Sequence, residues 1–143
     1  MILYLDTSAL IKAYIEEKYS EDVLQAITKT KIVASNVISY VELHAALARL
    51  QREQKLTENE INKFKKLFKQ DWEDYLQVEV TEALLNTAAE FTEVFALRAY
   101  DSMQLASAHF LLKHTTQSLV FACFDNKLNQ AARVLGLELL AQS

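Results

Sequence analysis

The sequence predicts an α/β fold in which a mainly parallel sheet lies between two layers of helices, a three-layer α/β/α sandwich. Short, continuously apolar runs such as Ile2–Leu5 and Leu119–Phe124 indicate strands that are buried on both faces. The longer segments between these runs carry apolar residues at helical spacing. Strand and helix patterns alternate along the chain, and this alternation is typical of a parallel sheet covered by helices on both sides.

The first half of the chain is expected to contain two strands and four amphipathic helices. The strands are the apolar runs Ile2–Leu5 and Lys31–Ala34. The helices are expected at Ser8–Glu17, from a cap at Ser20 through Ile27, at Val37–Gln54, and from Thr57 to about Asp74. Thr57 and Glu60 have the spacing of a capping box, which fixes the start of the fourth helix.

The second half is expected to contain three strands and three helices. The strands are predicted at Leu76–Val80, Leu119–Phe124 and Leu137–Leu140. The helices are predicted from a cap at Thr81 to about Phe95, at Tyr100–His114 and at Asp125–Leu135. Gly136, the only glycine, is suited to a left-handed cap that ends the last helix.

Length and composition exclude several classes of protein. The 143 residues suit a single domain over residues 1–143. One glycine excludes the glycine-rich loops that bind phosphates or dinucleotides. A single cysteine, Cys123, excludes an internal disulfide and fits a reducing compartment. No apolar run is long enough for a membrane helix, and Asp6 interrupts the first one, so a cytoplasmic protein without a signal peptide is expected.

The charge is unevenly distributed. The whole chain carries a net charge of −4, which argues against a strongly basic nucleic-acid-binding protein. Residues 49–69, however, contain seven basic and three acidic residues. This basic stretch is either the solvated face of a helix or a patch that attracts a polyanion.

Four acidic residues stand at positions that matter in a parallel sheet. Asp6 directly follows the first strand and Asp125 follows Leu119–Phe124, so both are expected at the edge where ligands of such sheets bind. Glu42 and Asp101 lie on helical faces that are otherwise apolar. Carboxylates on a face turned toward the core are costly unless something compensates their charge.

Helix capping is the alternative explanation for each acid taken alone. Asp6, Asp101 and Asp125 stand near expected helix starts, where aspartate is favoured, and Glu42 follows Ser39 at the spacing of a capping box. Four carboxylates gathered at one place, however, would repel one another and take up protons unless a divalent cation bound them. Mg²⁺ prefers oxygen ligands of this kind, and bound divalent ions catalyse phosphodiester hydrolysis.

Four segments that contain these acids form a recognisable series: Tyr4–Lys12, Ser35 with Val41–Leu43, Arg98–Ala106, and Phe124–Leu128 with Ala131, Ala132 and Gly136. In this order they resemble the four sequence motifs of PIN-domain ribonucleases. The series spans residues 4 to 136, which is nearly the whole chain. Each motif is short, and the combination of all four is what makes the resemblance specific.

The resemblance implies a PIN-like fold with Rossmann- or flavodoxin-like layering and a divalent-metal-dependent endoribonuclease. It assigns Asp6, Glu42, Asp101 and Asp125 to a site for Mg²⁺, with Mn²⁺ as the alternative. Small PIN proteins are mostly VapC-type toxins of VapBC toxin–antitoxin pairs, so an RNA substrate, a homodimer and an antitoxin whose C-terminal tail covers the active site are also implied. Family members often carry serine or threonine where this chain has Cys123, and a thiol is a poor partner for a hard cation.

Two further functions are open from the residues. A non-catalytic PIN-like module that binds RNA or protein would keep the fold with an incomplete site. A phospho-acceptor domain would use Asp125 as the acceptor, but it needs a lysine at the end of a later strand, and the last strand ends without one. Metal binding distinguishes the nuclease from the first of these, and labelling by a phosphodonor identifies the second.

The supporting residues also have two interpretations each. Ser8 is expected to hydrogen-bond Asp6 or a metal-bound water, or else only the helix start. Arg98 is expected to steady Asp101 or contact a phosphate, or else to form a surface ion pair. The three histidines lack metal-ligand spacing and are expected to be non-catalytic. Trp72 and Tyr75 are expected in the core or an interface, with base stacking as the alternative.

Overall fold

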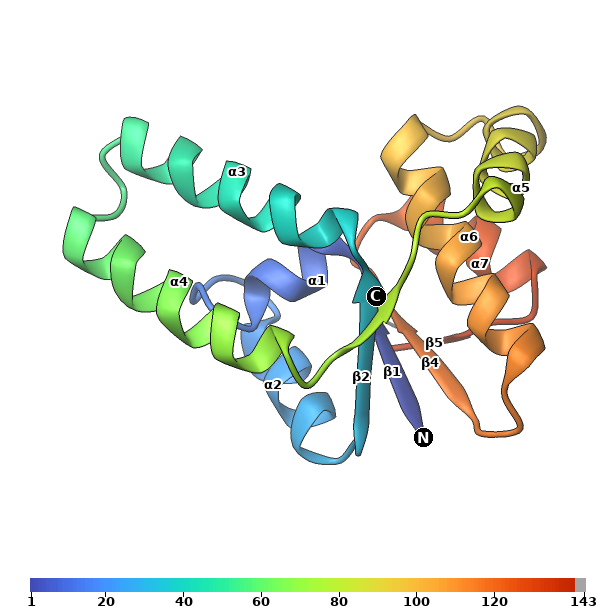
Figure 1. The fold of residues 1–143 in the computed structure, drawn as a ribbon, viewed down its shortest axis with the longest axis horizontal. Coiled ribbons are helices and arrows are strands. Elements are labelled where there is room, and N and C mark those ends of the chain that lie inside the picture. The colour runs from blue at the N-terminus through green and yellow to red at the C-terminus, as the bar shows by residue number, and fades with distance from the viewer. Residues whose placement is uncertain (141–143) are drawn as a thin grey trace.

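A computed structural model describes residues 1–140 and confirms the predicted fold class. One parallel sheet of five strands has the order β3-β2-β1-β4-β5 (Figure 1). The strands are β1 (Ile2–Leu5), β2 (Ile32–Asn36), β3 (Leu76–Val78), β4 (Leu119–Ala122) and β5 (Glu138–Leu139). The central strand β1 pairs with β2 on one side and β4 on the other. A single domain over residues 1–143 stays a prediction.

Seven helices in this part of the chain cover the two faces of the sheet. They are α1 (Thr7–Lys12), α2 (Ser20–Thr28), α3 (Ile38–Arg52), α4 (Glu58–Trp72), α5 (Glu82–Val94), α6 (Ala99–His114) and α7 (Asn126–Val134). Figure 1 shows α1 to α4 on one side of the sheet and α5 to α7 on the other. None of these helices is both long enough and apolar enough to cross a lipid bilayer.

Strand β1 is apolar throughout because it contributes to two separate cores. Successive side chains of a strand point to opposite faces. Ile2 and Tyr4 pack with the core under α5, α6 and α7, whereas Leu3 and Leu5 pack with the core under α1 to α4. All four side chains are fully buried. The continuous apolar run in the sequence therefore reflects burial on both faces, as predicted.

Local capping residues fix most helix starts where the sequence predicts them. Thr57 and Glu60 form both hydrogen bonds of the capping box of α4. The hydroxyl of Thr81 accepts a hydrogen bond from the Leu84 amide at the start of α5. Gly136 has a φ of 85°, the left-handed conformation predicted for it after α7.

The segment between β1 and β2 differs from the prediction. Helix α1 ends at Lys12 rather than Glu17. Ser20 does not cap α2, because Tyr19 takes the cap position with a φ of 72°. The Ser20 hydroxyl instead accepts from the Glu17 amide and donates to the Ile15 carbonyl. Ser20 therefore stabilises the loop that separates α1 from α2.

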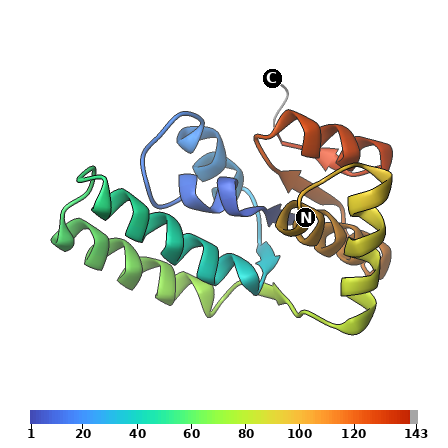
Figure 2. The same cartoon turned by 90° about the horizontal axis from the view of Figure 1, so that it is seen from above.

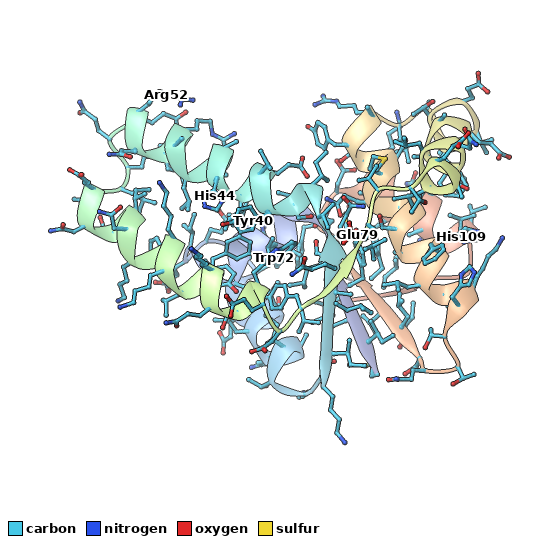
Figure 3. The ribbon with its side chains drawn as sticks, viewed as in Figure 1. Tyr40, His44, Arg52, Trp72, Glu79 and His109 are labelled. Atoms are coloured by element: carbon cyan, nitrogen blue, oxygen red, sulfur yellow. The ribbon has the colours of Figure 1, made fainter. Side chains whose placement is uncertain are left out.

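Helices α3 and α4 form an antiparallel pair that projects away from the sheet, as Figures 1 and 2 both show. Aromatic rings hold the base of this pair together, and Figure 3 shows Tyr40, His44 and Trp72 gathered there. The Tyr40 ring lies 5.4 Å from that of Phe68 and 5.6 Å from that of Trp72, centroid to centroid. Trp72 and Tyr75 are therefore both partly buried and pack against this core, which is one of the two positions predicted for them.

Candidate functional site

The topology brings Asp6 and Asp125 to the same edge of the sheet. Strands β1 and β4 are parallel neighbours, with Leu5 opposite Ala122 at their carboxyl ends. Asp6 caps α1 by accepting from the Ala9 amide at 2.9 Å, and Asp125 caps α7 by accepting from the Leu128 amide at 3.0 Å. The capping explanation and the shared-edge explanation are therefore both correct for these two acids.

Glu42 on α3 and Asp101 in the first turn of α6 face the same place from the two sides of the sheet. Together with Asp6 and Asp125 they line one cleft of about 800 Å³, here called the acidic cleft. Ser8 and Arg98 also line it. The four acids and the two supporting residues predicted from the sequence thus all line this one cleft.

The negative charge of the acidic cleft is not matched by ion pairs. Within residues 1–140 two ion pairs form, and both involve other acids, Glu17 and Glu53. Lys127 lines the cleft, but its ammonium group donates to the Ala96 carbonyl at 2.6 Å. The four carboxylates thus form no ion pair within residues 1–140, and a divalent cation is the partner that their oxygen ligands suit.

Two of the acids have pKa values above the usual range. Burial raises the pKa of Asp6 to about 6, although the hydrogen bonds from Ala9, Ser8 and Cys123 oppose this shift. Burial is also the largest cause of the raised pKa of Asp101, and the charges of Asp125 and Glu42 add to it. Raised pKa values are expected from crowding, but loss of solvent contributes more than repulsion does.

The side chains next to the acids have defined partners. The Ser8 hydroxyl donates to Asp6 Oδ1 at 2.7 Å, so it orients that carboxylate. The positive charge of Arg98 lowers the pKa of Asp101, although Arg98 forms no ion pair within residues 1–140. None of the three histidines lines the acidic cleft.

Cys123 does not line the acidic cleft; it lies buried in the turn between β4 and α7. The Asp125 amide donates to its sulfur at 3.3 Å. Burial raises the pKa of the Cys123 thiol, so the group is neutral at physiological pH. The thiol thus supports the turn that presents Asp125 and supplies no negative charge to the cleft.

A buried glutamine, Gln104, connects the acidic cleft to the core. Its carbonyl oxygen accepts from the Tyr4 hydroxyl at 2.6 Å. Its amide nitrogen lies 2.9 Å from the Ser39 hydroxyl and 3.2 Å from Glu42 Oε1, both within donating distance. The Thr7 hydroxyl donates to the same Glu42 oxygen at 2.6 Å. These contacts hold the Glu42 carboxylate in one orientation.

Neither Gln104 nor Ser39 is among the site residues predicted from the sequence. Gln104 follows Asp101 by three residues, on a helical face that is otherwise apolar, which is the same signal that marks Glu42 and Asp101. Ser39 lies inside α3, which begins at Ile38, so the capping-box interpretation of Ser39 and Glu42 is wrong. The Ser39 hydroxyl instead lies 2.7 Å from that of Ser35 and contacts Gln104.

The donor chemistry suits a divalent cation, but the side chains are not gathered around one point. Within residues 1–140, no three Asp, Glu, His or Cys side chains are close enough to hold a metal ion together in this arrangement. Two of the acids are held by neighbouring groups: Asp6 by Ser8 and Ala9, and Glu42 by Thr7 and Gln104.

Comparisons with known proteins agree with this architecture. The chain is 31% identical over 139 residues to Ribonuclease VapC45 of Mycobacterium tuberculosis, covering 94% of this chain and 92% of that protein. Its fold is similar to FitAcB from Neisseria gonorrhoeae, with a TM-score of 0.64, 19% identity and coverage of 97% and 96% of the two chains. VapBC2 from Rickettsia felis bound to a promoter DNA fragment gives a TM-score of 0.65, 12% identity and 97% coverage of each chain. The family profile of the PIN domain matches residues 3–134, and the chain therefore belongs to the PIN domain family.

Proposed function

We propose that the protein is a Mg²⁺- or Mn²⁺-dependent endoribonuclease that hydrolyses RNA phosphodiester bonds, and that it is the toxin of a VapBC-type toxin–antitoxin pair. The observation that carries this proposal is the acidic cleft, which four carboxylates line at the carboxyl edge of a parallel sheet and in which none of them forms an ion pair within residues 1–140. The similarity to a protein named Ribonuclease VapC45 supports the same activity.

In this proposal Asp6, Glu42, Asp101 and Asp125 hold the metal. A bound Mg²⁺ or Mn²⁺ supplies an activated water and stabilises charge on the leaving oxygen. The chain's own residues prepare the ligands: Ser8 orients Asp6, and the Leu128 amide orients Asp125. Thr7 and Gln104 orient Glu42 in the same way.

Arg98 has a different role in the proposal. It stands at the start of α6, next to Asp101 on the wall of the acidic cleft, and its guanidinium group is not committed to an ion pair within residues 1–140. A guanidinium in this position suits a phosphate oxygen better than a lysine would, because its fork of donors matches the oxygen pair. We assign Arg98 to the phosphate of the substrate.

The test is cleavage of a mixed RNA pool by purified protein with Mg²⁺, with Mn²⁺ and with EDTA. Metal-dependent cleavage is expected for the wild type and for Asp74→Asn, a matched change of an exposed acid outside the cleft. Asp101→Asn is expected to lose cleavage, because it removes a charged ligand without changing the shape of the side chain. Cleavage by Asp101→Asn at the wild-type rate would contradict the proposal.

A non-catalytic PIN-like module that binds RNA or protein is the second candidate. It is favoured by the spacing of the acids, no three of which are gathered at one point within residues 1–140. Calorimetric titration with Mn²⁺ separates the two functions. Heat of binding that disappears in Asp101→Asn supports the nuclease, whereas no binding together with no cleavage supports the module.

The partners follow the same proposal. A structure described as a toxin–antitoxin complex from Klebsiella pneumoniae shares the fold, with a TM-score of 0.58, 13% identity and coverage of 82% and 83% of the two chains, and this similarity supports an antitoxin partner for this chain. We further propose that the protein forms a homodimer and acts in the cytoplasm. Co-purification with the product of the adjacent gene tests the antitoxin partner. Light scattering of the purified protein tests the homodimer.

Metal binding is expected to stabilise the protein more strongly at about pH 8 than at about pH 5. The pKa of Asp6 is about 6 without metal, so at pH 5 this ligand must lose a proton before it binds a cation. The affinity at about pH 5 is therefore expected to be about tenfold lower, which corresponds to about 1.4 kcal/mol. Thermal unfolding with Mn²⁺ and with EDTA at both pH values measures this difference, and an equal stabilisation at both would contradict the shared site.

A further inference from the structure

The acidic cleft continues along one face of α3 into a basic region. Glu42, Ala45, Ala46, Arg49 and Arg52 all line it, at the spacing of residues that share one face of a helix. A helix rises 1.5 Å per residue, so Arg49 and Arg52 lie about 10 Å and about 15 Å along the axis from Glu42. Figure 3 shows Arg52 at the end of α3 that is remote from the sheet. The two arginines are here called the arginine track.

The arginine track is free to bind an anion. Both side chains are exposed, and neither forms an ion pair within residues 1–140. Ala45 and Ala46, which lie between the acids and the arginines, are too small to block a strand that runs along the helix. The cleft therefore has a negative end, where the sheet edge supplies carboxylates, and a positive end on α3.

We propose that the arginine track binds the phosphate backbone of single-stranded RNA that flanks the scissile bond. This inference rests on the proposed nuclease function and names the part of the substrate held outside the acids. A phosphodiester placed at the acidic end must continue along one of the open directions of the same cleft. The positive end provides guanidinium groups in that direction, and these pair with phosphate oxygens independently of the base sequence.

The five lysines of the stretch 49–69 behave differently, and one of them, Lys55, forms an ion pair with Glu53 at 3.3 Å. Lys63, Lys65, Lys66 and Lys69 are exposed on α4, and no residue of α4 lines the cleft. The sequence leaves two interpretations of this basic stretch open, a solvated helical face and a patch that attracts a polyanion. In the structure each interpretation fits a different part of the stretch. The lysines of α4 fit the solvated face, and the two arginines fit the patch.

An acidic protein segment could also pair with two guanidinium groups. RNA is favoured because the arginines and the acids lie along a single cleft. An RNA strand with its scissile phosphodiester at the acids would reach both arginines. Between the two charged ends α3 presents only Ala45 and Ala46, and the larger apolar residues of the cleft, Ile11 and Leu97, lie on other segments, whereas a protein partner would need an apolar pocket for an anchoring side chain there.

The experiment compares two double variants that each remove two positive charges from the same stretch. Arg49→Gln/Arg52→Gln changes the arginine track, and Lys65→Gln/Lys66→Gln is the matched control on α4. Binding of a fluorescent, mixed-sequence single-stranded RNA is measured in EDTA, where no cleavage occurs, over a series of salt concentrations. The arginine variant is expected to bind roughly tenfold more weakly, with a salt slope reduced by about 1.4, because each phosphate contact contributes about 0.7.

The control variant is expected to bind RNA within twofold of the wild type, and both variants are expected to keep the wild-type melting temperature. If both double variants weakened RNA binding equally, the cause would be general electrostatic attraction instead of direct contact, and the inference would be overturned. Unchanged binding by the arginine variant, or a wild type that does not bind RNA in EDTA, would also overturn it. If polyglutamate bound through the arginines and RNA did not, the arginine track would be assigned to an acidic protein instead.

The same samples separate this inference from the proposed nuclease. If RNA binds through the arginines but the wild type shows no metal-dependent cleavage, the nuclease function fails and the track stands. If cleavage is metal-dependent and the arginine variant keeps its KM, the track fails and the nuclease stands. With both correct, the arginine variant raises KM and leaves kcat nearly unchanged, because its side chains lie away from the acids.

Discussion

Replacing Asp6 by asparagine is expected to abolish RNA cleavage and, at the same time, to stabilise the metal-free protein. The loss of activity follows from the proposed role of Asp6 as a metal ligand. Residues that only orient metal ligands already contribute about 10- to 100-fold to activity, so loss of a ligand is expected to cost about 100-fold or more. The gain in stability follows from the burial of the charge, since the Asp6 side chain is 5% exposed.

The sign of the stability change follows from the pKa of Asp6. It is about 6 in the folded chain, against 3.8 for the ordinary side chain. The folded state therefore binds more protons between these values, and its stability falls as the pH rises from about 4 to about 6. Asparagine has no charge to bury, so the stability of the variant does not fall in this pH range for this reason. Asp6→Asn is expected to be up to about 3 kcal/mol more stable than the wild type at about pH 8 in EDTA, and this gain should vanish below about pH 4.

Urea unfolding in EDTA at these two pH values measures the effect. Asp6→Ala is the informative companion variant, because it removes the charge and also the acceptor for the Ala9 amide, a helix cap that contributes about 1 kcal/mol. Its gain should be smaller than that of the asparagine variant. The exposed Asp74→Asn should change neither activity nor stability. A wild type as stable as Asp6→Asn at pH 8 would show that burial does not strain this carboxylate.

The parts of the fold that depend on local rules could be predicted from the sequence. Strand β1 is apolar at every position because both of its faces are buried, and the alternation of strands with helices leads to a parallel sheet. In such a sheet the residues that follow neighbouring strands meet at one edge, so the placement of Asp6 and Asp125 at the same edge could be predicted from the sequence alone. Glu42 and Asp101 could be found because a carboxylate interrupts an apolar helical face.

Features that depend on distant contacts could not be predicted. The cap of α2 is Tyr19, whose unusual backbone accompanies stacking on Phe124 at 4.9 Å, more than a hundred residues away in the sequence. The partition of the basic stretch between a cleft and a solvated face depends on how α3 and α4 are turned. The role of Gln104 could not be predicted either, because it depends on a hydrogen bond from Tyr4, which is 100 residues away in the sequence.

Replacing Gln104 by methionine, which has a similar length, is expected to lower both stability and activity. The change leaves the buried Tyr4 hydroxyl without its acceptor and removes the donor that Ser39 and Glu42 share. A buried polar group that loses its partner costs about 1–3 kcal/mol, so a loss of about 3 kcal/mol in the free energy of unfolding is expected. Urea unfolding measures it, with Gln25→Met on the exposed face of α2 as the matched control.

A second change separates folding from positioning. Tyr4→Phe/Gln104→Met removes both partners of the buried hydrogen bond, so it should be more stable than Gln104→Met by about 1 kcal/mol. Its kcat should nevertheless stay low, because Glu42 still lacks the Gln104 donor, whereas RNA binding in EDTA should match the wild type. Recovery of kcat together with stability would mean that Gln104 acts only through the fold. Recovery of stability alone would mean that this buried amide orients the Glu42 carboxylate, so that a hydrogen bond from the core of the sheet contributes directly to the chemistry of the acidic cleft.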